Sequence, residues 1–149
     1  MAEMWLDNAH DPEQLRRMEE LKQNGECHFC GNITEKHTAP IIYENLRWFI
    51  VANDFPYKGS VHHYLIVSKQ HFTKLSDLYV EAQMELFDAI RWLETNLNIT
   101  GESIFVRSGD MTRTGATLDH LHLHFIVGEK KSDETEWLTI TVGYKKKDL

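Results

Sequence analysis

The stretch from His120 to Phe125, HLHLHF, places a histidine at every second position with apolar residues between. In a β-strand, side chains alternate between two faces, and residues i and i+2 lie about 6.6–6.8 Å apart on the same face. A strand over residues 119–127 would therefore carry three imidazoles on one face and the leucines on the other. Three neighbouring imidazoles need polar partners that an ordinary apolar core does not supply. We therefore expect this face to be a functional site.

Length, composition and charge narrow the class of protein. The chain has 149 residues, of which 42% are hydrophobic, so one domain over residues 1–149 with its own core is expected. No apolar run approaches the ~20 residues of a membrane span, and the N-terminus lacks the layout of a signal peptide, so a cytoplasmic protein without membrane contact is expected. The net charge of −7 disfavours binding to long nucleic acids but leaves a small phosphorylated ligand open.

The pattern of apolar residues and turn residues predicts an α+β fold, an antiparallel sheet with helices packed on it. A short helix is expected over residues 11–24, with Asp11 as its N-cap. A long helix is expected over residues 77–95, capped by Ser76. The apolar face of this long helix is expected to comprise Leu78, Met84, Phe87, Ile90 and Trp92. Strands are expected within residues 41–53, where two short ones turn at Asn45, and over residues 62–68, 102–108, 119–127 and 136–144.

The only two cysteines, Cys27 and Cys30, form a C-x-x-C motif. A redox pair of this kind usually follows a strand and opens a helix, whereas here a helix precedes the motif and a loop follows, which favours a metal. A structural zinc ion takes four ligands, so two nitrogens are still required. His71 and one histidine of the HLHLH row are candidates, and His37 competes with His71. His28 lies inside the motif and is poorly placed to bend back to the same ion.

At least one imidazole of the row then remains free to react. A neutral imidazole is a competent nucleophile near pH 7, because its ordinary pKa is about 6.5. Attack on phosphorus would give a covalent intermediate and divide one displacement into two easier ones. Two alternatives stay open: a catalytic metal site built from all three histidines, and a module in which the histidines bind phosphate without turnover.

The row HLHLHFI resembles the signature of the histidine triad (HIT) family of nucleotide hydrolases and transferases. Two further stretches are similar to that family: ANDFPYKGSVHHYLIVSKQH, which looks like its nucleotide-binding segment, and TGATLDHLHLH, which looks like its glycine loop. Some branches of the family also carry C-x-x-C near the N-terminus. The resemblance covers roughly residues 27–127 and is nearest to the dinucleoside-polyphosphate phosphorylase side of the family.

This resemblance implies an α+β fold, usually dimeric, that binds a nucleoside phosphate over its sheet. It implies that His122 is the nucleophile that takes up the nucleotidyl group and that His124 contacts the phosphate. It further implies a structural Zn²⁺ held by four residues, a histidine packed against the triad, and an asparagine that binds ribose. The zinc ligands are Cys27, Cys30, His71 and His120, the histidine packed against the triad is His63, and the residue that binds ribose is Asn53.

The sequence also departs from the common family pattern. Ala116 stands where many members have a glutamine, which removes one amide from the phosphate site. Arg113 and the hydroxyl of Thr117 are the preferred replacements, among flanking residues that include Arg107 and Ser108. Asp119 alternates with His120 and is therefore expected on the leucine face. The base, the leaving group, and the choice of water or phosphate as acceptor are left open.

Overall fold

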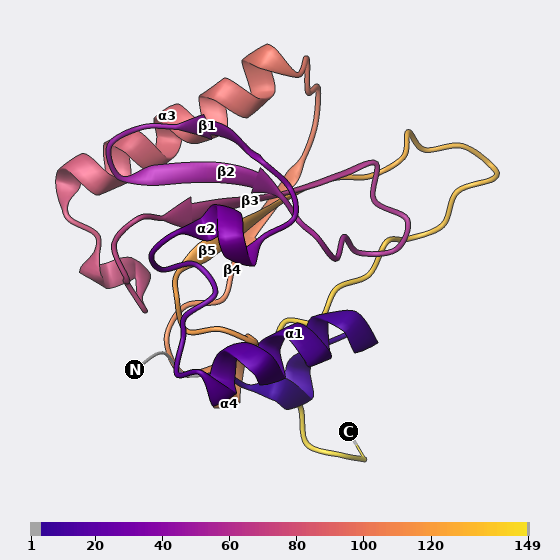
Figure 1. The fold of residues 1–149 in the computed structure, drawn as a ribbon. Helices are drawn as coiled ribbons and strands as arrows, with labels where there is room; N and C mark the ends of the chain where they lie inside the picture. Colours follow the sequence, from indigo (N-terminus) through magenta and orange to yellow (C-terminus); the bar gives the residue numbers. More distant parts are fainter. Residues whose placement is uncertain (1–3, 149) are drawn as a thin grey trace.

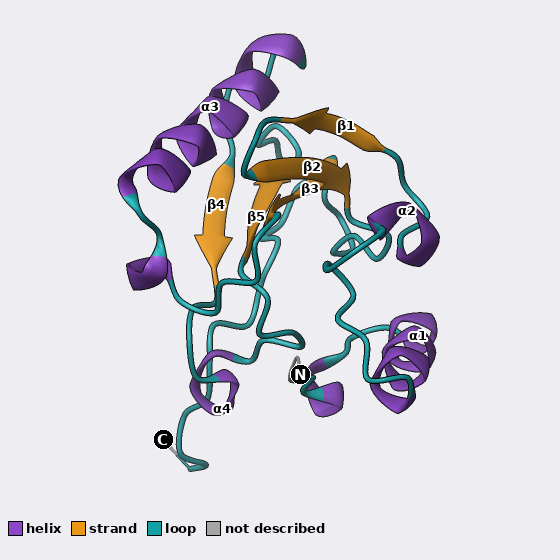
Figure 2. Ribbon diagram, turned by 60° about the vertical axis from the view of Figure 1, so that its left-hand side comes forward, coloured by secondary structure: helices purple, strands orange, loops and turns teal. Residues whose placement is uncertain are grey.

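The computed structural model describes residues 4–148, which form a five-stranded antiparallel sheet with helices around it (Figures 1 and 2). The strand order is β1-β2-β3-β5-β4. The strands are β1 (Ile41–Glu44), β2 (Trp48–Ala52), β3 (His62–Ser68), β4 (Ser103–Val106) and β5 (His122–Val127). The helices are α1 (Pro12–Gln23), α2 (Ile33–Lys36), α3 (Val80–Asn96) and α4 (Met111–Thr114), with short 3-10 turns at Leu6–Asn8 and Leu75–Asp77. The expected α+β class is confirmed.

The pairing of β3 with β5 sets the centre of the sheet. The register runs from His62 opposite Val127 to Val67 opposite His122, and β4 pairs with the other edge of β5. The β-branched residues of β3 suit this position, because a central strand is buried on both faces. The triad strand is shorter than the expected 119–127, since β5 begins at His122 and His120 precedes it.

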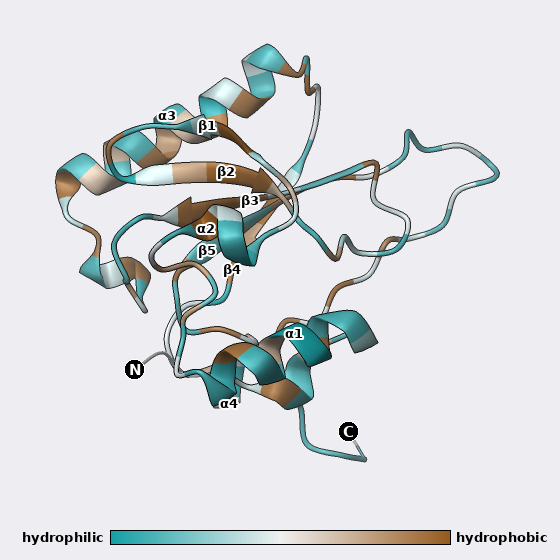
Figure 3. Cartoon of the chain, in the orientation of Figure 1, coloured by the Kyte–Doolittle hydropathy of each residue, from teal (hydrophilic) through white to brown (hydrophobic). Residues whose placement is uncertain are grey.

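Each face of the sheet supports a separate apolar core. Figure 3 shows the hydrophobic residues of β2 and β3 as brown stretches of the ribbon. Leu121, Leu123 and Phe125 belong to the core beneath α3, as the alternating pattern predicts. The opposite face packs against the N-terminal part of the chain. The buried members of this second core are Met4, Met18, Leu21, Phe29, Ile33, Phe49, Val51, Leu65, Val67 and Leu118. The alternation of β5 thus directs His122 and His124 toward this N-terminal side.

The N-terminal helix forms as the sequence predicts. The Asp11 carboxylate accepts hydrogen bonds from the backbone N–H groups of Glu13 and Gln14, and Pro12 occupies the first turn. Gly25 follows with a positive φ of 68°, a conformation that other residues rarely adopt and that ends the helix. Figures 1 and 2 place α1 away from α3, on the opposite side of the sheet.

The long helix differs from its prediction in start and in buried face. It begins at Val80, while Ser76 lies in the preceding 3-10 turn and makes no cap. Met84 and Phe87 are 64% and 63% exposed, so the expected apolar face was wrong in part. The buried positions on this helix are Ala82, Leu86, Ala89 and Leu93, with Ile90 and Trp92 partly buried beside them. Small alanines let the helix approach the sheet closely, and a count of large apolar residues misses that.

The strand expected over residues 136–144 does not form, and this prediction was wrong. Trp137 is 93% exposed, and the segment is held by side chains of other elements. The Arg107 guanidinium donates to the carbonyl of Thr141 at 2.6 Å, and the Tyr144 hydroxyl donates to Asn8 Oδ1 at 2.6 Å. β-Propensity expresses packing against neighbouring strands, and this segment has no strand partner among residues 4–148. Within the same residues, no helix is both long and apolar enough to cross a membrane.

Candidate functional site

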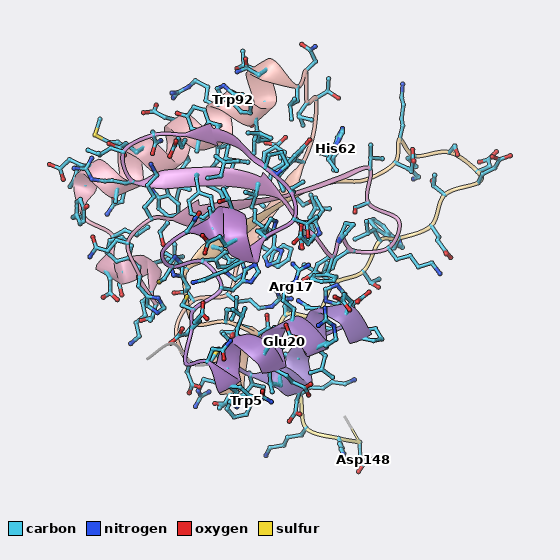
Figure 4. The ribbon with its side chains drawn as sticks, in the orientation of Figure 1. Trp5, Arg17, Glu20, His62, Trp92 and Asp148 are labelled. Carbon is cyan, nitrogen blue, oxygen red and sulfur yellow. The ribbon has the colours of Figure 1, made fainter. Side chains whose placement is uncertain are left out.

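A cavity of about 420 Å³ lies on the N-terminal side of the sheet, within the range of small-molecule sites. His122 and His124 line it from β5, and Asn53, Asp54 and Tyr57 line it from the loop after β2. Other walls come from segments far away in the sequence. These are Asn8, His10, Gln14, Arg17 and Met18 near the N-terminus, His28 and Phe29 in the cysteine motif, and residues 137–141. Figure 4 shows Arg17 between α1 and the strands.

The central histidine of the row has one ring nitrogen fixed by its own backbone. Nδ1 of His122 lies 2.8 Å from the carbonyl oxygen of His120, so this nitrogen carries the proton and donates. Nε2 of the neutral ring then holds a lone pair, and the described residues give it no hydrogen-bond partner. Burial lowers the pKa of His122 to about 4, with repulsion from Arg107 adding to the effect. The ring is therefore neutral at pH 7, with Nε2 available.

The third histidine of the row belongs to a chain of hydrogen bonds that begins at a backbone amide. The N–H of Tyr57 donates to Nδ1 of His63 at 3.1 Å, so Nε2 of neutral His63 must carry the proton. That nitrogen lies 2.8 Å from Nδ1 of His124, to which it donates. Nε2 of His124 is then protonated and can donate a hydrogen bond. Burial lowers the pKa values of both rings, that of His63 to about 4, so both are neutral.

Arg107 is the cationic side chain nearest to this group. Its guanidinium lies over the Phe105 ring at 5.0 Å and donates to the Tyr57 hydroxyl at 3.3 Å. Phe105 stacks in parallel on His124 with ring centroids 4.4 Å apart. The charge of Arg107 helps to lower the pKa values of His63, His122 and His124, which places it close to all three. Arg107 is thus positioned to contact an anion in the cavity.

Of the other residues expected to contact a ligand, some lie on the cavity wall and one lies outside it. Thr117 lines the cavity, whereas the Arg113 side chain is 85% exposed on α4, 3.9 Å from Asp110, and is absent from the cavity wall. The Asn53 amide lines the cavity, but its oxygen already accepts from the N–H of Phe55. Its nitrogen lies 3.2 Å from Nε2 of His63. The roles expected for these residues stay predictions, and Arg107 is better placed for phosphate than Arg113.

Four side chains named from the sequence as metal ligands come together. The thiols of Cys27 and Cys30 and the Nδ1 atoms of His71 and His120 all lie within 4.8 Å of one another. Nδ1 of His120 is 3.5 Å from the Cys27 sulfur, 3.4 Å from the Cys30 sulfur and 3.0 Å from Nδ1 of His71. These separations suit the corners of a tetrahedron around one ion with bonds of about 2.0–2.3 Å.

The hydrogen bonds behind these ligands leave their lone pairs facing one another. Nε2 of His120 donates to the carbonyl of Ser68 at 2.6 Å, and Nε2 of His71 lies 3.3 Å from the Asp119 carboxylate. Both Nδ1 atoms then face one another as acceptors, and a cation between two acceptors 3.0 Å apart would satisfy both. The donor set therefore fits a metal ion. Asp119 was expected on the leucine face and instead lies beside His71, because β5 starts only at His122 and the alternation does not extend back to it.

The two rival histidines form a separate pair. Nε2 of His37 donates to the carbonyl of Ala52 at 2.7 Å, and its Nδ1 lies 3.1 Å from Nε2 of His28. Neither ring belongs to the four-residue cluster. The geometry thus selects His71 over His37 as the fourth potential ligand.

The comparisons with known proteins agree with this arrangement. The family model for the HIT domain matches residues 34–131, about two thirds of the chain, and the chain belongs to this family. No protein with a curated description matches. Solved structures share the fold. A HIT family hydrolase from Clostridium thermocellum is 23% identical, with 76% of this chain and 96% of that chain covered and a TM-score of 0.57. A Zn-bound histidine triad family protein from Mycobacterium smegmatis is 22% identical, with 80% and 84% covered and a TM-score of 0.55.

The matched region leaves out much of the cavity wall. Seven residues between Asn8 and Phe29, together with residues 137–141, lie outside residues 34–131 yet line the cavity. The sequence analysis missed the part played by α1 and by the C-terminal segment, because neither carries a chemical motif. Only the amphipathic pattern of α1 indicates that one of its faces is covered.

The buried histidines make a testable prediction about pH. An unfolded histidine takes up its proton near pH 6.5, whereas folded His63 does so only near pH 4 because burial lowers its pKa. The folded state therefore loses stability as the pH falls from about 6.5 to about 4. We expect the Cε1–H resonance of His63, assigned with His63→Gln, to titrate near pH 4. A midpoint near 6.5 would show that water reaches this ring and would contradict the burial argument.

Proposed function

We propose that the protein is a nucleotide-binding hydrolase or nucleotidyl transferase that works through a covalent nucleotidyl-histidine at His122. The observation that carries the proposal is the ring of His122 in the cavity wall, with Nδ1–H tied to the carbonyl of His120 and Nε2 unprotonated. A histidine held in this way is a nucleophile ready for attack on phosphorus. Membership of the HIT family supports a phosphorylated substrate.

In the first step, the Nε2 lone pair of His122 attacks the phosphorus next to the nucleoside. An N–P bond forms, the bond from phosphorus to the leaving group breaks, and the leaving group departs with the electron pair. The positive charge that develops on the ring is shared with Nδ1–H, which stays bonded to the carbonyl of His120. In the second step, water or another acceptor forms a bond to phosphorus and gives a proton to solvent. The N–P bond breaks and its electron pair returns to Nε2, which restores neutral His122. Suitable substrates are dinucleoside polyphosphates, phosphoramidates and related conjugates.

The neighbouring groups stabilise the charge that builds up on oxygen. His124 donates a hydrogen bond from Nε2, because His63 fixes its other nitrogen as an acceptor. Arg107 supplies a full positive charge beside the triad, and Thr117 supplies a hydroxyl on the cavity wall. Donors that are already oriented act on the transition state without reorganisation.

We further propose that Cys27, Cys30, His71 and His120 bind one structural Zn²⁺. Two thiolates and two imidazoles are ligands that zinc prefers, and four protein ligands leave no position open for a substrate. When bound, the ion fixes the cysteine motif against the start of the triad strand. His120 then serves as a ligand of the structural ion, which disfavours a catalytic metal site built from all three triad histidines.

Replacement of the proposed nucleophile tests the mechanism. We expect His122→Ala to reduce release of the mononucleotide from an adenosine 5′-phosphoramidate by at least 10⁴-fold, since no covalent step remains. In acid-quenched wild-type protein, intact mass spectrometry should show an added nucleotidyl group that the variant lacks. Turnover that survives in His122→Ala would refute the mechanism. Nucleotide binding by wild type without adduct or product would favour the non-catalytic module instead.

Metal analysis tests the zinc site. We expect about one Zn²⁺ per chain in the purified protein and loss of this metal in Cys30→Ser, together with a fall in melting temperature. His37→Gln is the matched control and should keep its zinc, because His37 lies outside the cluster. Loss of zinc from His37→Gln with retention in His71→Gln would reverse the ligand assignment.

We also propose a homodimer through the outer face of α3 and the free edge of β4. Val80, Met84 and Phe87 form an exposed apolar stripe on α3, and β4 ends the sheet with one unpaired edge. Light scattering should give a mass of twice 17.5 kDa. Met84→Glu with Phe87→Glu should shift the protein to a monomer with unchanged zinc content. A monomeric wild type would contradict the proposal.

A further inference from the structure

One polar group on the cavity wall has no part in the proposed chemistry. His28 lies between the two cysteines, is only 8% exposed, and lines the same cavity as His122. The ring of Phe29 separates the two histidines, with its centroid 4.9 Å from that of His28 and 5.0 Å from that of His122. The two imidazoles are therefore no more than about 10 Å apart, a span that a nucleoside 5′-phosphate can bridge.

Hydrogen bonds that start at the backbone fix which nitrogen of His28 carries the proton. Nε2 of His37 donates to the carbonyl of Ala52 at 2.7 Å, and this bond selects the tautomer in which Nδ1 of His37 is an acceptor. Nε2 of His28 lies 3.1 Å from that atom and must donate to it. Nδ1 of His28 is then an unprotonated acceptor. Among residues 4–148, no hydrogen-bond partner is found for it.

The surroundings of His37 hold this chain of hydrogen bonds in place. The Asp54 carboxylate lies 3.3 Å from Nε2 of His37 and accepts hydrogen bonds from the backbone N–H groups of Thr38 and Ala39. Arg17 from α1 pairs with the same carboxylate. Asp54 is thus bonded to a guanidinium and to two backbone N–H groups, and it holds His37 in place. His37 in turn fixes the His28 ring, whose Nδ1 is the acceptor.

We propose that Nδ1 of His28 accepts a hydrogen bond from a donor group of the bound nucleoside and makes the site selective for ligands that carry it. The inference rests on the proposed nucleotide binding and adds a residue that sets specificity. Two groups have this chemistry: an exocyclic amino group of the base and a ribose hydroxyl. A ligand without the donor leaves a buried acceptor unpaired, which is why such sites discriminate strongly.

Binding measurements on the zinc-loaded full chain test this assignment without reference to turnover. The probes are AMP, purine riboside 5′-monophosphate, which has hydrogen in place of the amino group, and the 2′-deoxy and 3′-deoxy forms of AMP. We expect wild type to bind AMP about 10-fold more tightly than one of these three analogues. The analogue that is penalised identifies the donor as the amino group or as a particular hydroxyl.

Two variants connect the discrimination to a single atom. His28→Gln keeps a donor toward His37 but lacks the Nδ1 acceptor, and His28→Phe keeps an aromatic ring beside Phe29. Both should bind AMP and the penalised analogue within about 2-fold of each other. His62→Gln on β3, outside the cavity wall, is the matched control and should keep the wild-type preference.

The outcomes separate this inference from the proposed function. If wild type binds nucleotides and forms the His122 adduct but treats all four probes alike, the role of His28 is refuted and the mechanism stands. A preference that persists in both His28 variants refutes it as well. If no nucleotide binds at all, the proposed function fails and the assignment of His28 fails with it.

Discussion

Hydrogen bonds to the backbone decide which nitrogen of the triad imidazoles and of His63 holds the proton. The carbonyl of His120 fixes His122, the N–H of Tyr57 fixes His63 and through it His124, and the carbonyl of Ser68 fixes His120. Because burial keeps the catalytic rings neutral, each has one donor and one acceptor, and fixing one nitrogen defines the other. The backbone thereby gives chemically identical side chains different free nitrogens, which suit the proposed roles of nucleophile, hydrogen-bond donor and metal ligand.

The pairing of β3 with β5 brings these groups together. His63 opposes Ile126 and lies two residues along β3 from Leu65, which opposes His124, and the two rings meet at 2.8 Å across the strands. Ser68 is the last residue of β3 and lies beside the start of the antiparallel β5, which places its carbonyl within hydrogen-bond distance of His120. The proposed catalytic histidines, and the contact that orients His120, are therefore built on one pair of strands.

The sequence was sufficient to predict the parts of the site that depend on local spacing. The alternation of HLHLH correctly separated the leucine face from His122 and His124. The family resemblance, rather than spacing, named the four potential metal ligands that the structure brings together. The sequence alone could not predict the parts of the fold and of the site that depend on tertiary packing. The buried face of α3 is set by alanines that fit the sheet, and Asp119 turns to His71 because the strand starts late. Residues 136–144 have a strand-like pattern but lack a neighbouring strand among residues 4–148, so the strand predicted from propensity alone does not form. The position of Arg107 above Phe105, and that of α1 beside the cavity, follow from contacts between distant segments.

A lysine side chain also holds the loop between the two cysteines in its conformation. The Lys36 ammonium donates to the carbonyls of Cys27 and Cys30, at 2.9 and 2.7 Å, and so ties both ends of the loop to α2. A loop already closed by an amine has little conformational entropy left to lose when an ion enters. In the proposed zinc site, the free energy of coordination would then be available for affinity, because α2 already holds the cysteine loop in the shape that binds the ion.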